Sequence, residues 1–147
     1  MFLVYEMEYK LPGKEKPSVS LIPYSSVYQE QYKTLYNESF HRMREELGIK
    51  PFDYIQDDSY FASGMENVYL LLQDEEIIGS VAIKGDEIDD LFVNSKYRGK
   101  AYGRQIVLWA MDQMTEDHIR LHVADWNKQA ISLYEDIGFE ITRKKLS

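Results

Sequence analysis

Hydrophobic and polar residues follow one another along this chain with two different periods. Residues 3–9 alternate between apolar and more polar side chains, which predicts a strand that we expect at an edge of a sheet. Further strands are predicted, from apolar or alternating runs, at residues 19–24, 68–73, 77–84, 87–93, 119–124 and 139–144.

Longer stretches repeat their apolar side chains at helical spacing. The first runs from Tyr28 to Leu47, between Ser25-Ser26, which can cap a helix, and Gly48. Its aromatic stripe is more typical of a packed core than of a cofactor site. Helices are also predicted at residues 105–114 and 127–137, with a short one at 57–65. This order of elements predicts the fold class α/β in a mixed α+β form, with helices on both faces of a mixed sheet, in a single domain of residues 1–147.

Length and composition fit a soluble globular protein, with 147 residues, 44% hydrophobic and 29% charged. The chain contains no cysteine, which excludes disulfides, cysteine-based metal sites and cysteine nucleophiles. Its apolar first residues lack a basic segment and are interrupted by Glu6 and Glu8, so we expect no signal peptide. No run of about 18 apolar residues is present. We therefore expect no membrane span and a cytoplasmic protein.

The formal charge of −8 argues against nucleic acid as a partner, because affinity for nucleic acid comes largely from basic residues at phosphates. The charge suits attraction of a cationic substrate, although it also serves solubility alone. The three histidines, His41, His118 and His122, stand at no ligand spacing, so we expect no metal site. The oligomeric state is open, with a homodimer among the options.

The stretch from Val93 to Arg104 is the most informative part of the chain. It links a predicted buried strand to a predicted helix and carries two glycines and several basic residues, among them Lys96, Arg98 and Lys100. Such a turn can direct backbone N–H groups and a helix N-terminus at one anion, and we expect a diphosphate there. Glycine-containing turns are also common without a ligand. The P-loop and dinucleotide-binding glycine patterns are absent, which argues against both classes.

Residues 98–103, Arg-Gly-Lys-Ala-Tyr-Gly, resemble the acetyl-coenzyme A signature Gln/Arg-x-x-Gly-x-Gly/Ala of the GNAT superfamily of N-acetyltransferases. The match is at Arg98 and Gly103, whereas Ala101 stands where the first glycine is usual. Alanine tolerates helical backbone angles, so we expect weakened rather than abolished pyrophosphate binding. Residues 127–139 are similar to a later motif of the same superfamily, Asn-x-x-Ala-x-x-Leu-Tyr-x-x-x-Gly-Phe. Two motifs in the right order make chance a poor explanation, and the resemblance covers about residues 68 to 142.

The resemblance implies a central, mostly antiparallel sheet and acetyl-coenzyme A as co-substrate. The pantetheine arm is then expected along the strand before the turn, and a backbone N–H near Leu91 would face the developing oxyanion. Asn127 is expected to bind the coenzyme, to cap its helix, or to do both. The cofactor-binding residues implied in this way are Leu91, Phe92, Val93, Arg98, Gly99, Lys100, Ala101, Tyr102, Gly103, Arg104 and Asn127.

Tyr134 matches the general acid of the family. A phenol with a pKa of about 10 is a suitable proton donor to a thiolate whose conjugate acid has a pKa of about 8.5. Taken without the motif, Tyr134 would be interpreted as a core residue on the apolar face of its helix. With the motif, we expect the acid role.

Carboxylates cluster at the start of the strand that leads to the turn: Asp86, Glu87, Asp89 and Asp90. They fit a solvated strand end, but the runs 88–93 (Ile-Asp-Asp-Leu-Phe-Val) and 123–127 (Val-Ala-Asp-Trp-Asn) also resemble the spermidine/spermine N-acetyltransferase branch. That branch reads Leu-Glu-Asp-Phe-Phe-Val and Val-Ala-Glu-Trp-Asn. The resemblance implies Asp89 as general base, with a bridging water, and Asp90 as the acid that binds the amine.

His122 is the rival base. Strand alternation places it on the face opposite Leu121 and Val123. By resemblance, it stands at the position of the glutamate base in ribosomal-protein alanine acetyltransferases. An imidazole with a pKa of about 6.5 can accept a proton at neutral pH, although a lone strand histidine is more often structural. The choice of base stays open among Asp89, Glu87, Asp90 and His122.

We therefore predict an acetyl-coenzyme A-dependent N-acetyltransferase that acts by direct attack of a primary amine. The acceptor is expected to be a small cationic, polyamine-like molecule or a peptide or protein amine, with no nucleic acid or membrane as partner. The alternative is a non-catalytic acyl-coenzyme A-binding or interaction module on the same fold.

Overall fold

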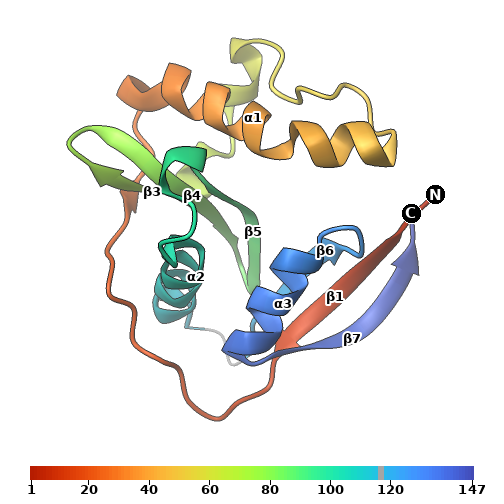
Figure 1. Cartoon of the computed structure of the whole chain (residues 1–147). Helices are drawn as coiled ribbons and strands as arrows, with labels where there is room; N and C mark the ends of the chain where they lie inside the picture. The colour runs from red at the N-terminus through yellow and green to blue at the C-terminus, as the bar shows by residue number, and fades with distance from the viewer. Residues whose placement is uncertain (116–117) are drawn as a thin grey trace.

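The computed structural model describes residues 1–115 and 118–147, and its centre is one seven-stranded sheet (Figure 1). In chain order the strands are β1 Leu3–Tyr9, β2 Ile22–Pro23, β3 Val68–Gln73, β4 Glu76–Lys84, β5 Glu87–Val93, β6 Arg120–Ala124 and β7 Phe139–Leu146. Across the sheet their order is β2-β3-β4-β5-β6-β1-β7, and every neighbouring pair is antiparallel except β5 with β6. The predicted fold class, with a mixed and mostly antiparallel sheet, is therefore confirmed.

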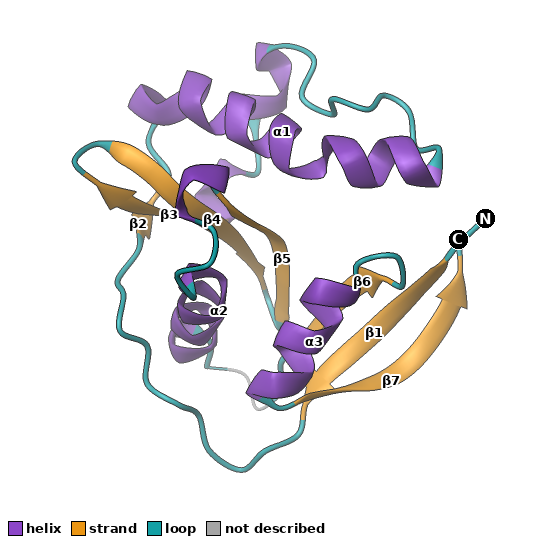
Figure 2. Ribbon diagram, viewed as in Figure 1, coloured by secondary structure: helices purple, strands orange, loops and turns teal. Residues whose placement is uncertain are grey.

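Helices cover both faces of the sheet, as expected (Figure 2). They are α1 Gln29–Leu47, α2 Tyr102–Gln113 and α3 Lys128–Ile137. On the face that carries α1, Tyr32 packs with Leu70 and other buried residues of β3 and β4. On the other face, Ile106 of α2 joins Met7 and Leu121 in a larger core that also includes side chains of α3. Among the described residues, no helix combines the length and apolarity needed to cross a membrane.

The N-terminal strand is correctly predicted in extent but wrongly placed at an edge. β1 lies between two partners, with Tyr5 opposite Val123 of β6 on one side and Lys144 of β7 on the other. Both partners come from the last part of the chain, so local alternation could not reveal them. The predicted strand over residues 19–24 is reduced to Ile22–Pro23 at the true edge, where a proline without an N–H is tolerated.

Several helix boundaries also differ from the prediction. The helix expected over residues 57–65 is replaced by 3-10 turns at Asp58–Ala62 and Met65–Asn67. Gly64 separates them with a φ of +86°, which is outside the helical region. Helix α2 begins at Tyr102, earlier than the predicted residue 105. Ser25 precedes another 3-10 turn, and its side chain accepts no capping hydrogen bond from the described residues.

An irregularity in β5 interrupts its pairing with β4. Asp90 has a φ of +50°, and the pairing of β4 with β5 shifts there, so that Asp90 and Leu91 together oppose a single residue of β4. This bulge reverses the side-chain alternation: Ile88 packs in the core of α2 and α3, whereas Phe92 packs in the core of α1. The parallel pairing of β5 with β6 covers only two residues of each strand, at 87–88 and 120–121, and the strands then diverge (Figure 1).

Candidate active site at the diverging strands

A cavity of about 550 Å³ lies where β5 runs into the turn before α2. We call it the turn cavity. It is lined by all the residues that the family resemblance implied for the coenzyme except Lys100, namely Leu91, Phe92, Val93, Arg98, Gly99, Ala101, Tyr102, Gly103, Arg104 and Asn127. The fold therefore gathers residues from β5, the turn and the start of α3 around one space.

The backbone of the turn adopts left-handed angles at two positions. Gly99 has a φ of +78° and Ala101, the N-cap of α2, has a φ of +63°. The expectation that Ala101 adopts ordinary helical angles is therefore wrong. Its left-handed conformation is strained, because a Cβ is disfavoured at positive φ. Gly103 is different: a Cβ there would meet Leu133 at 3.6 Å and Val93 at 3.7 Å, in ordinary contact at the cavity wall. A larger side chain would occupy the cavity itself.

The basic side chains of the turn are less available than the sequence suggests. Lys96 forms an ion pair with Glu76 at 2.7 Å, outside the turn cavity. The Arg104 guanidinium contacts carboxylates of Glu15 and Asp136 at 2.8 and 3.0 Å. Lys100 lies over the ring of Tyr97, with its ammonium 5.8 Å from the centroid. Backbone N–H groups and Arg98 are consequently the main candidates for contact with an anion.

A second cavity, of about 320 Å³, adjoins the first. We call it the strand cavity. The two share lining residues Phe40, Met43, Leu91, Asn127 and Ala130. The strand cavity is also lined by the residues singled out for chemistry, Asp89, Asp90, His122 and Tyr134. The structure thus brings all four side chains to one space beside the turn cavity.

Asn127 stands at the junction of the two cavities and caps α3. Its Oδ1 accepts a hydrogen bond from the backbone N–H of Ala130 at 3.1 Å. The predicted capping role is confirmed, and the position of the side chain on both cavity walls leaves a ligand role compatible with it.

Tyr134 of α3 is both a core residue and a cavity residue. The residue is 7% exposed, and its ring packs edge-on against Phe139, with ring centroids 6.0 Å apart. Burial, and then the negative charge of Asp89, raise the pKa of the phenol to about 12. The hydroxyl therefore keeps its proton at neutral pH, as a general acid must.

Asp89 and Asp90 are held together by the bulge. The backbone N–H of Asp90 donates to Asp89 Oδ1 at 2.8 Å, and the hydroxyl of Tyr36 donates to Asp90 Oδ1 at 3.1 Å. Burial, reinforced by the neighbouring carboxylate of Asp89, raises the pKa of Asp90. The ammonium of Lys84 lies 2.9 Å from Asp89 Oδ2 and 3.9 Å from Asp90 Oδ2.

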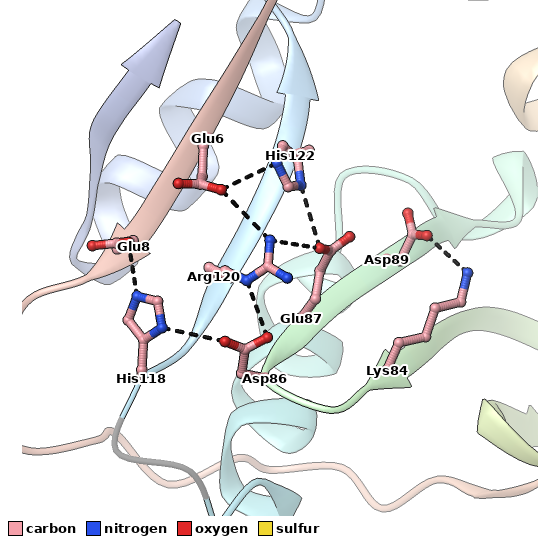
Figure 3. Close-up of polar contacts among 9 residues, drawn as sticks. All are labelled: Glu6, Glu8, Lys84, Asp86, Glu87, Asp89, His118, Arg120 and His122. Atoms are coloured by element: carbon pink, nitrogen blue, oxygen red, sulfur yellow. Dashed lines mark hydrogen bonds and ion pairs between the residues drawn. The ribbon is translucent and has the colours of Figure 1, made fainter. Parts of the chain in front are cut away.

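His122 lies between two carboxylates (Figure 3). Its Nε2 is 3.3 Å from Glu6 Oε1 and its Nδ1 is 3.4 Å from Glu87 Oε1. Arg120 contacts the same two oxygens, at 3.5 and 2.9 Å. Glu87, one of the base candidates, therefore joins this paired network and is not among the residues that line the strand cavity.

The network continues from Arg120 along β6 toward the surface. Arg120 Nε donates to Asp86 Oδ1 at 3.0 Å, and His118 bridges Asp86 and Glu8 at 3.2 and 2.7 Å (Figure 3). The hydrogen bond to Glu8 comes first among the causes that raise the pKa of His118. Asp86, part of the predicted carboxylate cluster, thus belongs to this network of ion pairs on the sheet. Unlike Asp89 and Asp90, it does not line the strand cavity.

Lys84 and Tyr36 are the site residues that the sequence interpretation missed. Lys84 could have been found, because the two-residue turn at 85–86 pairs it with Glu87 and makes Asp89 its diagonal neighbour across the hairpin. Tyr36 comes from α1, and no local pattern connects it to β5. Helix α1 also contacts the segment before α3, where Trp126 lines the turn cavity and its Nε1 donates to Glu46 Oε2 at 2.5 Å.

Comparison with known proteins gives a family match and partial relatives. Residues 28–139 match the family model described as the acetyltransferase (GNAT) family. The chain is similar to the peptidyl-lysine N-acetyltransferase YjaB of Escherichia coli, with 29% identity over 68 residues, 46% of this chain and 45% of the relative. It is also similar to the thialysine N-epsilon-acetyltransferase of Sus scrofa, with 33% identity over 54 residues, 35% of this chain and 32% of the relative. The matches thus span less than half of each curated relative.

Similar folds occur among solved structures. A GNAT family acetyltransferase from Colwellia psychrerythraea has a TM-score of 0.70 at 9% identity, covering 97% of this chain and 53% of that one. The apo form of YjaB from Escherichia coli has a TM-score of 0.66 at 20% identity, covering 84% of each chain. At these identities the likeness shows the fold alone. In residues 1–115 and 118–147, no group of three or more His, Cys, Asp or Glu side chains is arranged to hold a metal ion.

Proposed function

We propose, from the premise that this chain belongs to the acetyltransferase (GNAT) family, that it is an acetyl-coenzyme A-dependent N-acetyltransferase acting on a primary amine. The observation that carries this proposal is the shared wall of the turn and strand cavities at Leu91 and Asn127. One cavity is lined by the signature turn, and the other by side chains able to hold a cation and move protons. An acetyl group at the wall would be within reach of both.

The turn cavity fits the coenzyme in two respects. The absence of a side chain at Gly103 leaves room against Leu133 and Val93 for a pyrophosphate near the N-terminus of α2. The residues before the turn, Leu91 to Val93, form the end of β5 beyond the point where β6 diverges, and a pantetheine arm could pair with this backbone as an added strand. Arg98 would supply positive charge.

Acetyl-coenzyme A would supply a thioester whose carbonyl carbon accepts the amine. Asp89, through a water, would take the proton that the acceptor ammonium must lose before its nitrogen can attack. As the C–N bond forms, the backbone N–H at Leu91 would stabilise the oxygen that becomes negative. When the C–S bond breaks, Tyr134 would donate its proton to the departing thiolate, and the nitrogen would lose its second proton, which restores the phenol directly or through solvent. The proton taken by Asp89 would then pass to solvent. The amine attacks directly, and no acyl-enzyme is formed.

The assignment of the base favours Asp89 over His122. Asp89 is a strand-cavity residue close enough to Tyr134 for its charge to affect the phenol's pKa. Both ring nitrogens of His122 face carboxylates, which hold the imidazole in the network of β1, β5 and β6. Glu87 contacts His122 and Arg120, so we rank it below both.

We propose a cationic acceptor, such as a polyamine, a lysine-like side chain or an aminoglycoside. Asp90 would bind the ammonium, and the net charge of −8 would attract it. The relatives' names support this class, because peptidyl-lysine and thialysine both present a primary amine on a flexible chain. Peptide and protein amines belong to the same chemical class.

The proposal is tested by thiol release from acetyl-coenzyme A over a panel of amines, which includes spermidine, a lysine peptide, peptides with free N-termini and an aminoglycoside. Amine-dependent release with at least one cationic acceptor is expected. Coenzyme binding by calorimetry, without release on any amine, would instead identify a non-catalytic acyl-coenzyme A-binding module.

A further inference from the structure

A third cavity lies on the other side of the two carboxylates in β5. It has a volume of about 450 Å³, and we call it the tyrosine cavity because Tyr36, Tyr54 and Tyr60 line it. Asp89 and Asp90 line it as well as the strand cavity, so the acid pair forms a wall common to both. Groups in either cavity can therefore reach the same negative charge.

Lys84 brings a positive charge to this wall from the end of β4 (Figure 3). Its side chain belongs to the tyrosine cavity, and its Nζ lies 2.9 Å from Asp89 Oδ2 and 3.9 Å from Asp90 Oδ2. The hydrogen bond to Asp89 raises the pKa of Lys84, so this amine stays an ammonium at neutral pH. A primary alkylammonium thus already stands at the acid pair.

We propose that Lys84 competes with the ammonium of the acceptor for the Asp89–Asp90 pair. Its own ammonium occupies the pair until an acceptor amine displaces it. Lys84 thereby sets how much positive charge an acceptor must carry. The inference rests on the proposed function, because it uses the acid pair as the acceptor site. With Lys84 in place the three groups carry a net charge of −1, so an incoming ammonium meets half the charge of the free pair.

The geometry allows this exchange without rearrangement of the fold. The side chain of Lys84 is 49% exposed, and that of Asp89 is 41% exposed, so their ion pair is partly solvated and holds weakly. The long aliphatic stem lets the ammonium move into water while the strand stays paired. Asp90 is less exposed, at 22%, and accepts a hydrogen bond from Tyr36, so it keeps its place for the acceptor. An acceptor with several positive charges competes better with Lys84 than a monocation does.

The test compares Lys84→Met, which keeps the stem and removes the charge, with Lys84→Arg, which keeps the charge. Lys16→Met is the matched control, because it removes one positive charge from an exposed residue of a loop outside these cavities. In Lys84→Met we expect the KM for spermidine to fall about tenfold, because a like charge beside the site is removed. The KM for trifluoroethylamine, a weakly basic amine uncharged at the assay pH, should stay constant. Lys84→Arg keeps a positive charge at the acid pair and should not show this fall in KM, and Lys16→Met should resemble the parent protein.

An unchanged or higher KM for spermidine in folded Lys84→Met, or an equal fall for the uncharged amine, would overturn the proposal. Calorimetric titration of spermidine into each variant without coenzyme is an independent readout. It should show tighter binding in Lys84→Met, and in Lys84→Gln if the methionine variant does not fold. If the parent protein released no thiol with any amine, the proposed function would fail, while this titration would still decide whether Lys84 competes for a cation. If the parent protein turned over amines but Lys84→Met changed neither KM nor affinity, only the inference about Lys84 would fail.

Discussion

The turn cavity and the strand cavity share a wall but are built on different principles. The turn cavity is lined mainly by a nearly continuous stretch of chain, residues 91–104, with α3 and one part of α1 completing its walls. Its shape depends on backbone conformation at Gly99, Ala101 and Gly103. The strand cavity is lined by residues of α1, β1, β5, β6 and α3, and its chemistry depends on ion pairs that Asp90 makes with Lys84 and His122 with Glu6. A short motif can therefore specify the first, whereas the second exists only after the sheet has assembled.

The largest effect is expected at Tyr134 in the strand cavity. Tyr134→Phe keeps the ring and its packing on Phe139 but removes the proton donor, so kcat should fall about 10²–10⁴-fold. The affinity for acetyl-coenzyme A, measured by calorimetry, should stay the same. Because the pKa of Tyr134 is raised to about 12, the phenol stays protonated well above neutral pH. The parent protein's rate should therefore not decline near pH 10 through this group, and wild-type turnover in the variant would leave Tyr134 with a packing role only.

The next largest effect is expected at Asp89, the proposed base in the strand cavity. Asp89→Asn retains an oxygen for the backbone N–H of Asp90 but cannot take a proton, and we expect kcat to fall about 100-fold.

Asp90→Asn should mainly raise KM for polyamines and make this KM less sensitive to salt. His122→Gln should be the mildest of the three in steady-state kinetics. If His122→Gln abolished turnover while both aspartate variants remained active, His122 would be the base and the polyamine analogy would lose its main support.

In the turn cavity, Gly103→Val should lower the affinity for acetyl-coenzyme A tenfold or more, which corresponds to about 1.4 kcal/mol. The branched side chain would extend beyond the Cβ position, which already contacts Leu133 and Val93, into the turn cavity. Gly103→Ala is the control, since its single methyl group fits at 3.6 Å or more and should cost less affinity. Unchanged affinity in folded Gly103→Val, measured by calorimetry, would place the coenzyme elsewhere.

The smallest effect is expected at Ala101. Ala101→Gly should relieve the strain of a φ of +63°, stabilise the fold by about 1 kcal/mol and raise Tm by about 2–4 °C. Acetyl-coenzyme A affinity should rise less than tenfold. Ala110→Gly, the same change inside α2, should instead destabilise the protein, because glycine is unfavourable within a helix. Loss of stability in Ala101→Gly would contradict a strained turn.

The sequence predicts the placement of the turn residues better than the contacts of the Asp89–Asp90 pair, because the turn is local and those contacts are not. Arg98 and Gly103 lie in one local motif, and their placement follows from strand, turn and helix in succession. The position of β1 between β6 and β7, and the hydrogen bond from Tyr36 to Asp90, depend on contacts between distant segments. Lys84 is intermediate, because hairpin register brings it to Asp89 but only if the pairing of β4 with β5 is known. Even in the turn, the sequence did not reveal the left-handed backbone of Ala101 or the pairing of Arg104 with Glu15 and Asp136.

The most direct test of the whole account is a single-turnover reaction with enzyme in excess over acetyl-coenzyme A, in which free thiol and acetylated amine are both quantified. If the two cavities form one site for direct transfer, the thiol and the N-acetylated product should appear together in a 1:1 ratio, and only when a cationic primary amine is present. Thiol release without an amine, or an acetyl group retained on the protein, would contradict direct attack at the shared wall.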